Sequence, residues 1–149
     1  MQFDSIDKVK TYLTTFVSGS HLHARTGLDR MQYLLSLLGN PQDSYPSIHI
    51  AGTSGKGSTA WMTAQILQAH GLHVGLHVSP HLLDVRERVQ IDGAYVSDVL
   101  LLQGANALAL AVEQCTQSEY GIPTYYEVNL ALAFYCFALA KVDVVVVEV

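Results

Sequence analysis

The sequence predicts a three-layer α/β fold built around an open, mainly parallel β-sheet. From residue 47 onward, segments with the period of a strand alternate with segments with the period of a helix. The first strand runs into a glycine-rich loop that is followed by a helix, and the final segment, Val142–Val149 (VDVVVVEV), is a continuous valine run. Such a run is typical of a central parallel strand that helices cover on both faces.

Two helices are expected ahead of the first strand. Apolar residues recur at helical spacing between Ile6 and Phe16, and Gly19 ends the pattern. A second amphipathic helix is predicted over Leu28–Leu38 (LDRMQYLLSLL), which Gly39-Asn40-Pro41 terminates.

The alternating part begins with a short strand over Ser47–Ala51 (SIHIA), followed by the glycine loop and a helix over Ser58–His70. A second strand is expected over His73–Val78. It should end there, because the proline that follows cannot continue the ladder. Glu87–Ile91 alternates like an exposed strand and meets Asp92-Gly93, a tight-turn signal. We therefore expect a small ribbon beside the main sheet.

Two long helices precede the valine strand. Val99–Gln117 follows a Ser-Asp cap signal, and Glu127–Lys141 is apolar nearly all round, which indicates a buried helix. A strand that is covered on both faces needs a further covering element after it, so we expect the sequence to be truncated after a core strand.

Composition narrows the classes of function. At 149 residues with 50% hydrophobic content, the chain has the length of one domain and enough apolar residues for a core. A net charge of -5 offers no basic stripe, so nucleic acid is not an expected partner. No signal-peptide core is present, and the apolar runs fall short of the roughly 20 residues that span a bilayer. Cys115 and Cys136 lack metal-type spacing, which predicts buried free thiols and a cytoplasmic protein.

The loop Ala51–Thr59 (AGTSGKGST) carries the strongest functional signal. It departs from the common phosphate loop, because two residues separate its first two glycines and a further glycine follows the lysine. Inward-turned amides, the positive end of a helix and a mobile lysine charge still suit a triphosphate. A glycine-rich turn without a ligand is the alternative. The candidate nucleotide-binding residues are Thr53, Ser54, Gly55, Lys56, Gly57 and Ser58.

A triphosphate needs a metal ion, whose ligands are expected at the carboxyl ends of the strands beside the loop. Ser79 follows the second strand, and Glu148 is the lone acid near the end of the valine strand. A buried carboxylate is costly without a cation, so the pair predicts a Mg²⁺ site. Taken singly, Ser79 also fits a turn residue, and Glu148 also fits a carboxylate that reaches solvent.

Three further groups of residues allow two interpretations each. In Pro123–Glu127 (PTYYE) the tyrosines suit a flat heterocycle, although Thr124 and Glu127 match a capping box, which the residues alone favour. Arg86 and Arg88 form either a solvated face or a contact with an anionic substrate tail. The histidines, including the pairs His21 with His23 and His77 with His81, match no zinc pattern.

Four stretches, in this order, resemble the folylpolyglutamate synthase and dihydrofolate synthase family of Mur-type ligases: HIAGTSGKGST, VGLHVSPHLLDVRERVQIDG, PTYYEVNLALAF and VDVVVVEV. The glycine loop alone indicates only the wider Mur ligase superfamily, and the SPHL, RERV and TYYE segments make the resemblance specific to the folate branch. The resemblance implies that residues 1–149 are the N-terminal part of the ATP-binding ligase domain. It also implies that the rest of that domain and a C-terminal domain are absent.

The resemblance implies a role for each matched segment. The glycine loop corresponds to the ATP loop, with Lys56 as the catalytic residue, and Ser79 and Glu148 correspond to two magnesium ligands. Ser54 stands where asparagine is frequent in the family, a small departure because the backbone does most of the holding. The implied substrate-binding residues are Thr124, Tyr125, Tyr126, Glu127, His81 and Gly27.

The implied activity is that of an ATP-dependent ligase. ATP would phosphorylate a carboxylate of folate or dihydropteroate, and the amine of L-glutamate would attack the acyl phosphate to form an amide. Two alternatives stay open, a Mur-type ligase of peptidoglycan synthesis and a non-catalytic nucleotide-binding module. We expect ATP and Mg²⁺ as cofactors, small-molecule substrates as partners and a monomeric parent protein, and we expect residues 1–149 alone to be inactive.

Overall fold

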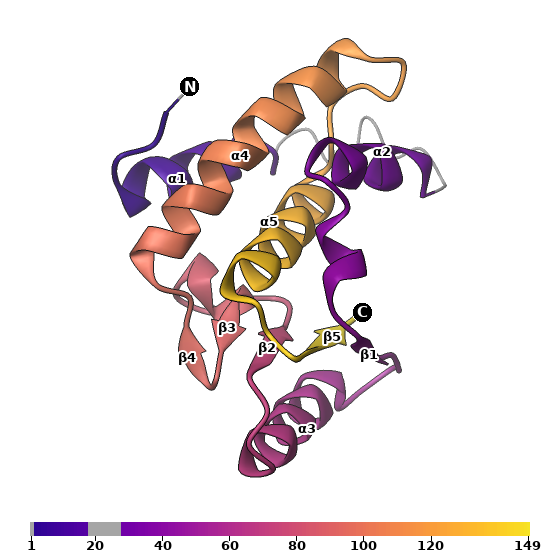
Figure 1. Cartoon of the computed structure of the whole chain (residues 1–149). Helices are drawn as coiled ribbons and strands as arrows, with labels where there is room; N and C mark the ends of the chain where they lie inside the picture. The colour runs from indigo at the N-terminus through magenta and orange to yellow at the C-terminus, as the bar shows by residue number, and fades with distance from the viewer. Residues whose placement is uncertain (1, 18–27) are drawn as a thin grey trace.

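Helices cover both faces of a single β-sheet in the computed structural model, which describes residues 2–17 and 28–149 (Figure 1). The strand order is β1-β5-β2-β3-β4, in which β1, β5 and β2 are parallel and β3 and β4 add an antiparallel ribbon. The predicted three-layer, mainly parallel open sheet is confirmed. The strands are β1 (Ser47–Ile50), β2 (Val74–His77), β3 (Gln90–Ile91), β4 (Ala94–Tyr95) and β5 (Val144–Glu148).

One helix packs on one face of the sheet and a thicker helical layer on the other. In Figure 1, α3 lies below the sheet, whereas α5 lies above it with α4 stacked on α5. The α-helices are α1 (Ile6–Thr14), α2 (Asp29–Leu37), α3 (Lys56–Ala69), α4 (Asp98–Gln117) and α5 (Tyr125–Ala140), and the 3₁₀ helices are η1 (Pro41–Ser44) and η2 (Val85–Arg88).

The valine strand β5 is the middle one of the three parallel strands, and helices cover both of its faces, as its sequence predicts. Val144 and Val146 point toward α3, where they pack in one apolar cluster with Ala60 and Ala64. Val145 and Val147 belong to the larger cluster on the opposite face, which residues of α4 and α5 dominate. Because side chains alternate along a strand, an unbroken valine run supplies both clusters at once.

Glycines allow α5 to approach the sheet closely and α4 to approach α5 closely. A Cβ atom at Gly75 in β2 would lie 2.7 Å from Cδ1 of Phe137 in α5, closer than a real side chain tolerates. A Cβ atom at Gly104 in α4 would likewise lie 2.8 Å from Sγ of Cys136. Cys115 and Cys136 are buried free thiols, as the sequence predicts.

Most element boundaries differ by one or two residues from the sequence prediction, and three of the differences have a clear local cause. The helix after the glycine loop begins at Lys56 rather than at Ser58, because Gly55 adopts a left-handed φ of 73° and turns the chain directly into the helix. The helix α5 begins at Tyr125 rather than at Glu127, because Thr124 is its N-cap. The predicted strand over Glu87–Ile91 is wrong in its first part, which lies in η2, and only its last two residues form β3.

By length and composition, α4 alone among the described helices could cross a membrane. In the structure, α4 packs along α5 and contributes Leu101, Leu108 and Val112 to the core. A core helix of this kind passes the same compositional test.

Candidate active site

The glycine loop connects the carboxyl end of β1 to the start of α3, as a phosphate site requires. The loop residues from Gly52 to Gly55 are exposed, and Lys56 is the first residue of the helix. The first amides of a helix have no intrahelical acceptor, so those of Lys56, Gly57 and Ser58 are available to an anion. The expected nucleotide-binding residues therefore form one continuous turn.

The two expected metal ligands meet beside this turn. The backbone N–H of Ser79 donates a hydrogen bond of 2.9 Å to Oε2 of Glu148. A Cβ atom at Gly57 would lie 3.5 Å from the same carboxylate oxygen, so the first turn of α3 passes directly against Glu148. The strand order explains the meeting, because β5 lies between β1 and β2 and all three parallel strands end at one edge.

This donor set fits a hard divalent cation. Glu148 is only 7% exposed and makes no ion pair within residues 2–17 and 28–149, so its negative charge lacks a protein cation. Mg²⁺ prefers a few carboxylate and hydroxyl oxygens together with phosphate oxygens and water. In the described part of the chain, no group of three or more His, Cys, Asp or Glu side chains could hold a metal ion, and a site with one carboxylate and one hydroxyl agrees with that finding.

The capping box at the start of α5 is present. Oγ1 of Thr124 accepts from the N–H of Glu127, and the Glu127 carboxylate accepts from the N–H of Thr124 at 2.7 Å. Oε2 of Glu127 also accepts a hydrogen bond of 2.8 Å from Nε of Arg30. Both side chains of this ion pair are largely buried. This pair joins α2 to α5 and fixes the direction in which the helix begins.

The two tyrosines that follow Thr124 lie close to charged groups of the site. The guanidinium of Arg88 lies over the ring of Tyr125, 5.4 Å from its centroid. Burial raises the pKa of Tyr126, whose phenol also experiences the charges of Arg88 and Glu148. Tyr125 therefore contacts Arg88, and Tyr126 is near enough to both Arg88 and Glu148 to experience their charges.

Arg88 is a buried cation without a carboxylate partner. It is 7% exposed, its Nε donates a hydrogen bond of 2.7 Å to Nδ1 of His81, and no Asp or Glu of the described residues pairs with it. Arg86, two residues earlier, is half-buried and pairs with Asp84 and Asp98. The RER segment thus divides between a solvated ion-pair network and a buried, uncompensated charge, which the charge pattern alone did not distinguish.

His77, at the carboxyl end of β2, forms a hydrogen bond with the backbone of Arg88. Its Nδ1 lies 2.8 Å from the carbonyl oxygen of Arg88, which makes Nδ1 the donor, and its Nε2 is buried without a partner among the described atoms. Burial lowers the pKa of His77 to about 4, so the ring is neutral. Sequence reasoning considered His77 only as a zinc ligand with His81, and both rings instead contact Arg88.

Three of the residues singled out in the sequence, His21, His23 and Gly27, lie outside the described residues. A cavity of about 170 Å³ opens beside the site between α1 and the loop before η2, and His81, Tyr125 and Lys10 line it.

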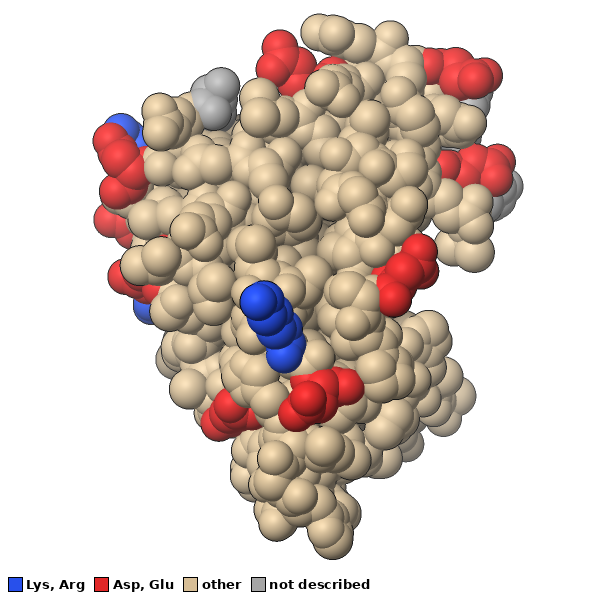
Figure 2. Space-filling model, viewed as in Figure 1, with Lys and Arg blue, Asp and Glu red and all other residues tan. Residues whose placement is uncertain are grey.

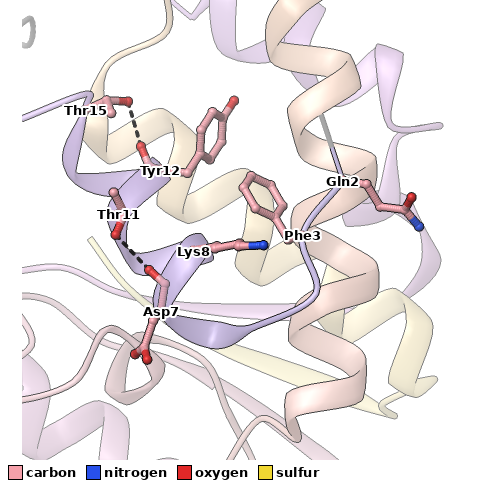
Figure 3. A pocket seen from close by; sticks show the side chains of 7 residues that line it. All are labelled: Gln2, Phe3, Asp7, Lys8, Thr11, Tyr12 and Thr15. Carbon is pink, nitrogen blue, oxygen red and sulfur yellow. Dashed lines mark hydrogen bonds between the residues drawn. The ribbon is translucent and has the colours of Figure 1, made fainter.

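A larger cavity lies away from this site. Figure 3 shows that cavity, of about 440 Å³, on α1, where the rings of Phe3 and Tyr12 line it. The hydroxyls of Thr11 and Thr15 there donate to backbone carbonyls of their own helix. It contains none of the expected site residues. On the face drawn in Figure 2, acidic side chains are scattered and basic ones form no patch.

Comparison with known proteins places the chain among folate ligases. It is 39% identical over 125 residues to dihydrofolate synthase/folylpolyglutamate synthase of Bacillus subtilis, covering 83% of this chain and 29% of the relative. It is 43% identical over 129 residues to the protein of that name from Mycobacterium tuberculosis, covering 82% and 26%. The structure of Thermotoga maritima folylpolyglutamate synthase superposes with a TM-score of 0.86 at 38% identity, covering 95% of this chain and 32% of the other. No family model matches.

The fold and its solved relatives define an α/β domain of the Mur ligase type. Within that class, the chain belongs to the folylpolyglutamate synthase and dihydrofolate synthase family. It spans between 15% and 30% of the length of these curated relatives.

Proposed function

We propose that the chain is the part of an ATP-dependent ligase that binds the nucleotide and forms one wall of the folate site. The reaction would add L-glutamate to a carboxylate of folate or dihydropteroate through an acyl phosphate. The observation that carries the proposal is the meeting of the glycine loop, Ser79 and Glu148 at one edge of the sheet, beside the uncompensated charge of Arg88. Solved relatives in complex with ADP, with AMPPCP and with AMPPCP and folate support it.

We assign the nucleotide to the turn from Thr53 to Ser58. The loop amides and the positive end of α3 would orient the phosphates, and Lys56 would place its ammonium charge against the transferring phosphoryl group. The Ser79 hydroxyl and the Glu148 carboxylate would hold Mg²⁺, which offsets further phosphate charge when bound. No residue of the chain needs to act as a nucleophile, because the substrate carboxylate attacks the nucleotide itself.

We assign an anionic group of the folate substrate to Arg88. A buried guanidinium is costly without a partner, and a carboxylate that binds beside His81 and Tyr125 would supply one. The exposed face of Tyr126 is available to a planar ring. Thr124 and Glu127 would act through the start of α5, since hydrogen bonds within the protein engage their polar atoms.

The remaining expectations belong to this proposal. Residues 1–149 would form the N-terminal part of the ATP-binding domain, inactive without the rest of the ligase, in a monomeric cytoplasmic protein that binds neither nucleic acid nor membrane. Relatives named as mitochondrial forms make the compartment a point to test. A peptidoglycan ligase and a non-catalytic nucleotide module are the competing functions.

The test is glutamate-dependent ADP release by the full-length protein that carries this chain, with dihydropteroate and tetrahydrofolate supplied separately. We expect release with at least one of them, and its loss in Lys56→Ala. Release without a folate but with a peptidoglycan precursor would identify the other ligase. ATP binding without any glutamate-dependent release would identify a binding module.

A further inference from the structure

The carboxylate of Glu87 accepts hydrogen bonds from three backbone N–H groups in the loop before η2. Three successive N–H groups donate to it, that of Leu82 to Oε2 at 2.6 Å and those of Leu83 and Asp84 to Oε1 at 2.8 Å each. Successive amides that converge in this way form a nest of the kind that binds anions in other proteins. Here the anion is a side chain of the same loop.

Packing does not hold this loop in place. The side chains of Leu82 and Leu83 are 86% and 95% exposed, so almost no apolar burial stabilises their conformation. A short loop without buried side chains ordinarily opens at little cost in free energy. The three hydrogen bonds to Glu87, together with the one that Asp84 Oδ1 accepts from the N–H of Arg86 at 2.9 Å, therefore define its shape.

Ion pairs fasten the outside of the same loop to two helices. Oδ2 of Asp84 accepts from Nζ of Lys10 in α1 at 2.9 Å and also pairs with Arg86. Arg86 in turn reaches Asp98 at the start of α4, at 3.1 Å. These partly exposed pairs orient the loop relative to α1 and α4, and the Glu87 carboxylate sets its internal geometry.

The two ends of the loop meet at the substrate side of the site. His81 directly precedes the amides that Glu87 binds, Arg88 directly follows Glu87, and Nε of Arg88 donates to His81. The curvature of the segment therefore determines whether His81 reaches Arg88 over the ring of Tyr125.

We propose that Glu87 is a positioning residue for the folate site, whose carboxylate holds the loop closed so that His81 and Arg88 stand together beside Tyr125. The inference rests on the proposed function for its kinetic consequence, but the clamp itself does not. Glu87 does not touch the reacting atoms, so its loss should weaken folate binding and leave the nucleotide site intact.

Amide hydrogen exchange tests the clamp without any assay of activity. In Glu87→Ala, exchange at Leu82, Leu83 and Asp84 should accelerate by at least about tenfold, because three hydrogen bonds to a charged acceptor are lost. Glu87→Gln should fall between this variant and the wild type, since its single carbonyl oxygen can replace Oε1 and keep two of the three bonds. Glu119→Ala is the matched control, because Glu119 is exposed and makes none of the hydrogen bonds or ion pairs found in the described structure.

Steady-state kinetics of the full-length protein tests the positioning role. The KM for the folate substrate should rise by at least about tenfold in Glu87→Ala and by less in Glu87→Gln, with the KM for ATP within about twofold of wild type. A change confined to kcat, or an equal rise in both KM values, overturns the positioning role. Unchanged loop exchange in Glu87→Ala overturns the clamp. A wild-type protein without glutamate-dependent ADP release contradicts the proposed function instead, and the exchange result still decides the clamp.

Discussion

The backbone N–H of Ser79, and not its hydroxyl, holds the carboxylate of Glu148, at 2.9 Å from Oε2. The hydroxyl is therefore free to serve a cation while the main chain orients the second ligand. In the proposed Mg²⁺ site, Ser79 would contribute in two separable ways, through its backbone N–H, which any residue but proline has, and through its hydroxyl, which only its side chain provides.

Ser79→Ala should separate these two contributions. The variant keeps the N–H that binds Glu148, so its melting temperature should match that of the wild type. Its affinity for AMPPCP in the presence of Mg²⁺ should fall by on the order of tenfold, or about 1.4 kcal/mol. Calorimetric titration with and without Mg²⁺ measures the effect. An equal loss under both conditions would show that the hydroxyl binds the nucleotide rather than the metal ion.

Arg88→Met should weaken folate binding while keeping or increasing the stability of the fold. Removing a buried charge that lacks a carboxylate partner, and filling its place with an apolar side chain, should leave the free energy of unfolding unchanged or raise it by about 1 kcal/mol. The KM for the folate substrate in the full-length protein should rise strongly. Urea unfolding and the ADP-release assay provide the two readouts. Arg88→Met with reduced stability and an unchanged folate KM would mean that Arg88 only supports the loop.

Gly75→Ala should destabilise the chain by about 1–3 kcal/mol, because the new methyl group would lie 2.7 Å from the ring of Phe137 and the core has no space for it. Shortening the opposing side chain should relieve the overlap, so Gly75→Ala combined with Phe137→Leu should lose less than the sum of the two single changes. Thermal and urea unfolding of the four proteins measure this coupling. Strict additivity would contradict the proposed contact.

The thiols should be unreactive in the folded chain. Burial raises the pKa of Cys136 to about 12 and also raises that of Cys115, so at pH 8 the folded protein holds both as thiols. The pKa of each thiol is higher in the folded chain than in the unfolded one. Protonation of the two thiols therefore favours the folded state fully below the unfolded pKa, and this contribution to the free energy of unfolding is lost as the pH rises toward 12. A disulfide-exchange reagent at pH 8 should modify neither cysteine until denaturant is added. Rapid modification under native conditions would place a thiol at the surface.

Much of the fold follows from the sequence because long, strongly patterned segments specify it. The valine run identifies β5 as the central strand, and the glycine loop between a strand and a helix identifies the nucleotide site. That Ser79 and Glu148 would meet follows from parallel strands sharing one carboxyl edge. These inferences depend on which edge a residue occupies, and a two-residue error in a boundary, as at Lys56, does not change them.

The arrangement around Arg88 was not predictable in the same way. Had Glu87–Ile91 formed a regular strand from its first residue, Arg86 and Arg88 would flank Glu87 along one continuous ribbon. In the 3₁₀ turn of η2 they diverge instead, so that Arg86 reaches Asp98 and Arg88 enters the interior. The turn depends on the capping box between Asp84 and Glu87. A pair of residues three positions apart is so short a sequence motif that it often occurs by chance, so it did not predict the turn. His77 carried no signal at all, because its partner is a backbone carbonyl.

The position of β5 also has a consequence for how the chain folds. β1 and β2 come earlier in the chain and do not pair with each other, so their place in one sheet depends on β5, which lies between them. β5, which follows both strands in the sequence, pairs with each of them and brings Glu148 to Ser79. We therefore expect formation of the parallel sheet and assembly of the proposed cation-binding pair to be one event during folding.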